Sequence, residues 1–114
     1  MEKGPRSFEW LGNDEKRFEE NWPATREALL GVIKDCQLEE GVKEKLTQAV
    51  EDLDDHQTKW DNYIDAIEGT IRRIADMTAG LREGSDEKTK KEAAATFENL
   101  RDGLWDLFKK AREN

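Results

Sequence analysis

The first place where this sequence could support chemistry is an acidic run that ends in the only histidine. His56 follows Glu51-Asp52-Leu53-Asp54-Asp55. Asp52 and His56 are four residues apart, a spacing that places both side chains on one face of a helix. A metal centre in a helical bundle needs histidine–carboxylate pairs from two helices, which a single histidine does not supply. We therefore expect no metal, and we interpret His56 as part of a solvated polar surface.

No other residue pattern indicates catalysis. Cys36 is the single cysteine and lies on an apolar row, where a cysteine usually acts as a small, inert hydrophobic side chain. Gly80 and Gly84 are not followed by the lysine and hydroxyl residue of a nucleotide-binding loop. We predict that the chain is not an enzyme and binds no cofactor.

A short acidic run in the middle of the chain has no cations beside it. No lysine or arginine occurs between Leu46 and Thr58. On one continuous helix, the carboxylates there and just beyond would form a line of negative charge that imitates a nucleic-acid backbone. The simpler interpretation is an ordinary hydrated helix surface. If the line binds a partner, the candidate residues are Asp54, Asp55, Asp61 and Asp65.

Three large aromatic residues are further candidates for partner binding. Trp105 and Phe108 each follow a leucine of the last predicted apolar row by one position. We expect the core to absorb Phe108 and to leave Trp105 partly exposed. Trp105 then either anchors a partner, as large aromatics at helix edges often do, or covers an apolar cluster that includes Trp10.

Composition narrows the class of partner. The chain has 114 residues, 40% of them charged, and a net charge of -8. Proteins that bind nucleic acid or anionic membranes directly are normally basic, so we expect neither. A lone cysteine and the lack of a visible secretory signal or membrane span favour a cytoplasmic location.

The chain divides into a lead-in segment, residues 1–12, and a single helical domain, residues 13–114. Gly4-Pro5 is expected to interrupt regular structure in the lead-in. The first helical region extends to about Glu40, with Gly41 as a stop. Pro23 indicates that its main helix starts near Trp22, after a separate short turn. Its apolar row is Phe18, Trp22, Leu29, Ile33 and Cys36.

The strongest helical pattern covers residues 42–78. Apolar positions alternate at spacings of four and three, which is typical of a coiled-coil seam. The seam comprises Leu46, Val50, Leu53, Gln57, Trp60, Ile64, Ile67, Ile71, Ile74 and Thr78. A third helix, capped by Ser85, repeats the pattern with Ala93, Phe97, Leu100, Leu104, Leu107 and Ala111.

The last predicted helix resembles the third helix of a spectrin repeat. The resemblance extends over residues 97–112 and depends on Leu104-Trp105, Phe108 and Arg112. It implies a three-helix architecture.

We therefore predict an all-α fold, an antiparallel three-helix bundle with coiled-coil-like packing. The alternative is four helices, if the middle helix breaks near Gly69. Because the middle helix would be longer than its neighbours, we expect its surplus apolar seam to be covered in a homodimer.

The function expected from the sequence is a small protein-interaction protein, an adaptor, inhibitor or assembly subunit that binds a protein partner through helix faces. The alternative is an acidic inhibitor that mimics nucleic acid. Added salt distinguishes them, because binding through exposed charge weakens as salt screens it.

Overall fold

The computed structural model describes residues 5–84 and 86–112, with side chains from Asp14 onward. Every secondary-structure element in these residues is helical, which confirms the all-α class. The long helices are α1 (Pro5–Asp35), α2 (Glu40–Glu51), α4 (Tyr63–Gly84) and α5 (Glu87–Arg112). A 3-10 turn, η1 (Asp52–Asp55), and a short helix, α3 (His56–Lys59), connect α2 to α4.

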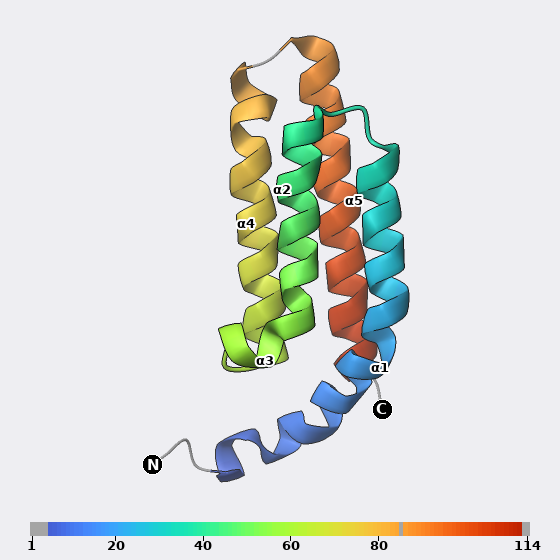
Figure 1. Cartoon of the computed structure of the whole chain (residues 1–114). Helices are drawn as coiled ribbons and strands as arrows, with labels where there is room; N and C mark the ends of the chain where they lie inside the picture. Colours follow the sequence, from blue (N-terminus) through green and yellow to red (C-terminus); the bar gives the residue numbers. More distant parts are fainter. Residues whose placement is uncertain (1–4, 85, 113–114) are drawn as a thin grey trace.

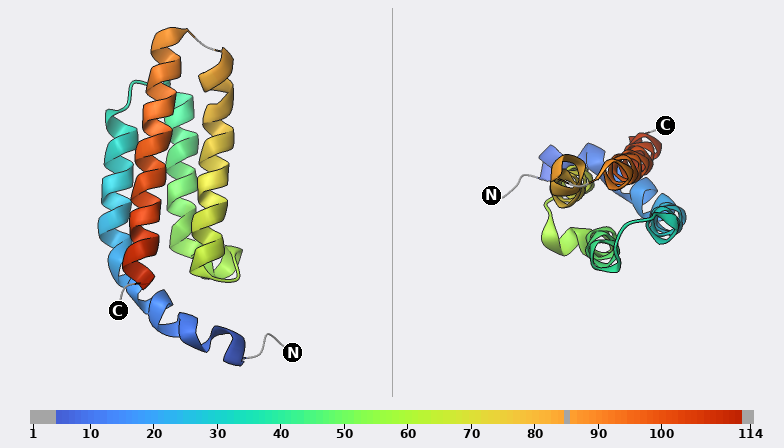
Figure 2. Two further views of the ribbon diagram at one scale, coloured as in Figure 1. Left: turned by 180° about the vertical axis from the view of Figure 1, so that it is seen from behind. Right: turned by 90° about the horizontal axis from the view of Figure 1, so that it is seen from above.

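The long helices form an up-down-up-down bundle (Figure 1). Viewed along the bundle axis, they make a ring in which each helix lies beside the next one in the chain (Figure 2). Helix α5 closes the ring by packing most extensively against α1 and α4, and α2 packs against α1 and α4. The described part of the chain therefore has four long helices, and the three-helix prediction is wrong.

The break in the middle helix lies at residues 52–62, well before Gly69. Asn62 begins α4 as a helix cap, because its side-chain oxygen accepts a hydrogen bond of 2.9 Å from the backbone N–H of Asp65. Trp60 just before it has an extended backbone conformation. Polar residues that hydrogen-bond to nearby backbone groups compete with helix continuation, and this local chemistry outweighs the unbroken apolar seam.

Gly69 lies inside α4 and has a packing role. A Cβ atom added at Gly69 would lie 2.7 Å from Nε1 of Trp60. The glycine therefore makes room for the Trp60 ring, which folds back onto α4 from the turn. The alternative of four helices is correct, but its predicted break point is not.

Helix α1 also differs from expectation at both ends. It begins at Pro5, inside the segment expected to be a lead-in, because proline fits the first helical position without losing a hydrogen bond. It continues through Pro23, so there is no separate turn before Trp22. It ends at Asp35, and Gly41, the expected stop, belongs to α2.

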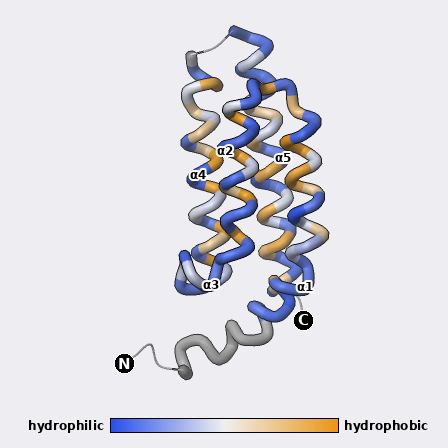
Figure 3. The backbone as a smooth tube through the Cα atoms, in the orientation of Figure 1, coloured by the Kyte–Doolittle hydropathy of each residue, from blue (hydrophilic) through white to orange (hydrophobic). Residues whose placement is uncertain are grey.

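The predicted apolar rows of α1 and α5 form much of the core. All five residues of the α1 row are buried, and so are five of the six in the α5 row. Phe97 is the exception; it is half-buried, and Thr96 takes the buried position beside it. Hydrophobic positions recur along each long helix between hydrophilic ones (Figure 3).

The middle seam changes register across the break. Leu46, Val50 and Leu53 of the seam are buried before it. After it, Ile67, Ile74 and Thr78 of the seam stay buried, but Tyr63 and Ala66, which the seam did not include, are buried beside them. Ile64 and Ile71, which the seam placed inside, are half-buried at the edge of the core. Since the two halves of the seam belong to helices that pack against each other, much of the seam is covered within one chain.

Helix α5 is capped by a carboxylate. Asp86 accepts a 2.8 Å hydrogen bond from the backbone N–H of Thr89, which lowers the pKa of Asp86. Ser85, the expected cap, lies outside the described residues.

Candidate functional site

The residues predicted to bind a partner come together at one end of the bundle. Asp54 and Asp55 lie in η1, Asp61 in the turn before α4, and Asp65 in the first turn of α4. Trp105 and Phe108 lie in the last turns of α5. Figure 1 shows these segments at the lower end, beside α3 and the C-terminal end of α5. The side chain of Trp10 lies outside the described residues.

Trp105 and Phe108 form an aromatic pair on α5. Trp105 is 37% exposed and is the only exposed large hydrophobic residue among the described side chains. Its ring meets Phe108 edge-on, with centroids 5.4 Å apart. Phe108 is half-buried, and its ring lies 6.2 Å from that of Tyr63. Both expectations for these residues are confirmed: Phe108 packs against the core, and Trp105 remains partly exposed.

The acidic residues do not form one continuous line. Nε1 of Trp22 donates a 2.6 Å hydrogen bond to Asp54, and Arg26 forms an ion pair of 3.4 Å with the same carboxylate. Asp55, Asp61 and Asp65 are exposed. The turn in the chain separates Asp54 and Asp55 from the helix that carries Asp65, so the rigid line of charge expected on one helix is not formed.

Asp52 has a structural role at the break. It is buried and accepts hydrogen bonds from Gln48 (2.9 Å), Lys59 (3.0 Å) and Arg73. These bonds, that of Arg73 foremost, lower the pKa of Asp52 to about 2 even though burial opposes the shift. Asp52 therefore connects α2 and α3 to α4 and does not pair with His56 as a metal ligand.

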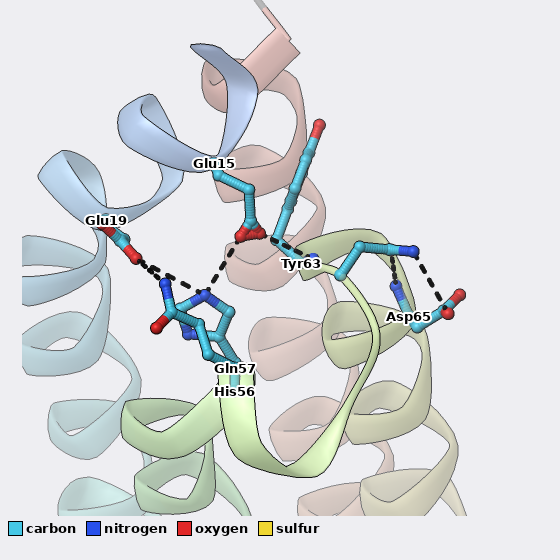
Figure 4. A network of polar contacts seen from close by, with 7 residues as sticks. Glu15, Glu19, His56, Gln57, Tyr63 and Asp65 are labelled. Carbon is cyan, nitrogen blue, oxygen red and sulfur yellow. Dashed lines mark hydrogen bonds and ion pairs between the residues drawn. The ribbon is translucent and has the colours of Figure 1, made fainter. Parts of the chain in front are cut away.

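His56 is buried, contrary to the solvated surface expected from its acidic neighbours. It is 5% exposed, and its ring packs edge-on against Phe18 with centroids 4.6 Å apart. Its Nε2 lies 3.3 Å from Glu15 and 3.9 Å from Glu19, both in α1 (Figure 4). Burial alone would lower the pKa of His56, but hydrogen bonding and charge attraction from Glu15 outweigh it and raise that pKa above 6.5.

The same glutamate extends the polar network to α4. Glu15 accepts a 3.1 Å hydrogen bond from the backbone N–H of Tyr63 (Figure 4). The Tyr63 hydroxyl donates to Asp14 at 3.2 Å, and burial next to that carboxylate raises the pKa of Tyr63 to about 12. Arg17 pairs with Asp14 at 2.6 Å and donates to the backbone oxygen of Ala111 at 2.7 Å.

These contacts fasten the first described turns of α1 to α3, α4 and α5. We define the Glu15 clasp as Asp14, Glu15, Arg17, His56 and Tyr63. Local spacing does not predict the clasp, because the carboxylates of α1 are more than forty residues from His56 and Tyr63. Each side chain of the clasp forms a hydrogen bond or an ion pair with another member or with the backbone. The clasp therefore stabilises the fold at this end of the bundle.

Other kinds of site receive little support from the described residues. Within them, no group of three or more His, Cys, Asp or Glu side chains is arranged to hold a metal ion. Cys36 is buried. A groove of about 530 Å³ between α1 and α2 has Leu30, Ile33 and Thr47 among its lining residues, with lysines and glutamates around them. None of the described helices is both long enough and apolar enough to span a membrane.

Comparison with known proteins gives no relative from which a role could be transferred: no family model, curated protein or solved structure matches the chain.

Proposed function

We propose that this chain is a small, non-catalytic protein-interaction protein that binds a protein partner through the outer face of α5. The observation that supports this most directly is Trp105, exposed and held edge-on by Phe108. Tryptophan is the residue most enriched among those that dominate binding energy, because it buries a large area at little cost in conformational entropy. Because Phe108 already positions the Trp105 ring, the tryptophan loses less conformational freedom when a partner binds.

The test compares wild type with Trp105→Ala. Each protein is immobilised, exposed to an extract of its source cells, and the retained proteins are identified by mass spectrometry. We expect a partner retained by wild type to be lost by the variant, with helix content by circular dichroism unchanged. Because Trp105 is partly exposed and its neighbours stay in place, the melting temperature should change little. If both proteins retain the same partner, Trp105 is not the anchor.

The alternative, mimicry of nucleic acid, has weaker support. A mimic needs carboxylates that are free and regularly spaced along a rigid surface, whereas Asp52 and Asp54 are engaged within the bundle. Salt separates the two functions. At 0.5 M salt, exposed charges attract one another over only a few ångströms. Partner retention through Trp105 should weaken but persist, because part of it is apolar contact, whereas retention by the exposed carboxylates alone should be lost.

A further inference from the structure

A second row of residues runs along α5 beside its buried row. Its members are spaced three or four residues apart and are half-buried or exposed. It contains three aromatic and three basic residues and no carboxylate, although the chain as a whole has a net charge of -8. This α5 outer row is Lys90, Ala94, Phe97, Arg101, Trp105, Phe108 and Arg112.

Stacking between neighbours orders the α5 outer row. The guanidinium groups of Arg82 and Arg101 lie over the ring of Phe97, at 4.9 Å and 5.4 Å from its centroid. Arg112 lies 5.8 Å from the centre of Phe108, whose ring also supports Trp105. Arginine stacked on an aromatic ring can still donate hydrogen bonds to carboxylates, although Nε of Arg82 is itself buried.

The side of helix α4 that lies next to the α5 outer row extends this surface. Ile64, Ile71, Ala75 and Arg82 fall on one side of α4, with spacings of seven, four and seven residues. The contact of Arg82 with Phe97 shows that this side lies next to the α5 outer row. Ile64 and Ile71 are half-buried, so their exposed parts add aliphatic surface. Glu68 is the acidic residue on this side of α4.

We propose that this α4–α5 outer face binds an acidic amphipathic helix of a partner protein. Apolar side chains of that helix would lie against Trp105, Phe108 and the two isoleucines, at the spacing by which helices recognise apolar surfaces. Its carboxylates would compete with exposed Asp102 for Arg101, whose Nη2 lies 3.5 Å from that aspartate. They would also lie next to Arg82, whose Nη2 donates to the backbone oxygen of Ala75 at 3.4 Å. The inference rests on the proposed function and specifies the partner's chemistry.

Charge favours this occupant over two others. A second copy that paired its α5 with this one would bring Arg101 and its neighbouring cations close to their equivalents, and like charges repel. A nucleic acid would meet exposed Asp102 and Asp106, which lie on α5 just beyond the row. Asp102 lies 3.5 Å from Arg101, so a narrow helix has to displace this one exposed carboxylate, whereas a wider nucleic acid would meet both.

The experiment uses two synthetic helical peptides labelled with fluorescein. Both carry leucines at helical spacing, flanked in one by glutamate and in the other by lysine, and binding to the full chain is followed by fluorescence anisotropy. We expect the glutamate peptide to bind about tenfold more tightly or better. Trp105→Ala should weaken it by about tenfold or more. Lys45→Ala, which removes an exposed cation of α2 away from this face, should leave it unchanged.

Charge reversal provides the decisive comparison. Arg101→Glu should reverse the preference in favour of the lysine peptide, with circular dichroism confirming an intact fold. The proposal is overturned if wild type binds neither peptide, if it binds both equally, or if Arg101→Glu keeps the original preference. It is also overturned if light scattering shows a dimer that Trp105→Ala dissociates, because the occupant is then a second copy. If a cellular partner depends on Trp105 while the peptides show no acidic preference, the proposed function stands and this inference fails.

Discussion

At the scale of single residues, the burial and protonation of His56 differ most from what its neighbours in the sequence suggest. The Glu15 clasp is the cause. A histidine among aspartates would ordinarily be solvated, but His56 is enclosed by Phe18 and held by Glu15. Its protonated form is favoured because the carboxylate compensates for the loss of water. The pH response of the lower end of the bundle should therefore depend largely on one ring.

The titration of His56 is the first prediction. Its pKa in the folded protein should lie above 6.5, so the stability it contributes is fully present below pH 6.5 and is lost as pH rises through the raised value. NMR follows this directly, because the chain has one histidine. Glu15→Gln should lower the pKa of His56, because the carboxylate that opposes the effect of burial is then gone. A pKa that stays raised in Glu15→Gln would show that Glu15 is not its main cause.

The second prediction separates two adjacent aspartates. Asp54→Ala removes the acceptor of Trp22 and the ion-pair partner of Arg26, and should lower the free energy of unfolding by roughly 1 kcal/mol, a modest value because Asp54 is partly exposed. Asp55→Ala, at an exposed neighbour, should change it by less than about 0.5 kcal/mol. Urea unfolding measures both. Equal effects would mean that the Trp22–Asp54 hydrogen bond contributes little.

At the scale of elements, the break between α2 and α4 is the feature that determines the architecture. Asn62 caps α4, Asp52 holds the turn to Arg73, and Trp60 packs over Gly69. Together these contacts favour two antiparallel helices where the apolar spacing alone favoured one long helix. The turn also places some of the acidic residues before the chain reverses and others after it. They therefore do not form a straight charged surface.

The third prediction compares two glycines of α4. Gly69→Ala should lower the free energy of unfolding by about 1 kcal/mol, because the new methyl group would meet Trp60 at 2.7 Å. Gly80→Ala meets nothing within 4 Å and should raise it by about 0.5–1 kcal/mol through better helix propensity. Thermal or urea unfolding of both variants is the measurement. A gain of stability in Gly69→Ala would show that Trp60 moves aside without cost.

At the scale of the whole molecule, four helices bury within one chain what three helices would have left for a second copy. Ile67 and Ile74 of the middle seam are buried inside the bundle. Ile64 and Ile71 keep part of their surface outside, next to the α5 outer row. Part of the remaining apolar surface therefore lies on the α4–α5 outer face, together with Phe97, Trp105 and Phe108.

The fourth prediction concerns the state of association. Since much of the seam that suggested a homodimer is covered within one chain, and since cations repel across a pair of α5 outer rows, the protein alone should be a monomer of 13.2 kDa. Light scattering after gel filtration, across a range of concentrations, measures this mass. A stable dimer would restore the expectation made from the sequence.

Much of this structure follows from spacing along the chain. The helical class, the buried rows of α1 and α5, and the partial exposure of Trp105 were all predicted, because each depends on which residues share a helix face and that depends on positions three and four apart. The capping of α5 by an acidic residue next to Ser85 is similarly local.

Tertiary structure alone decided the rest. His56 and Tyr63 meet carboxylates of α1, Asp52 meets Arg73, and Asp54 meets Trp22. These partners are 21 to 49 residues apart, so no local spacing indicates them. Burial then changes what each group does: an aspartate surrounded by donors becomes a structural anchor, and a buried histidine beside a glutamate favours its charged form. The fold likewise decides which acidic residues remain exposed to a partner.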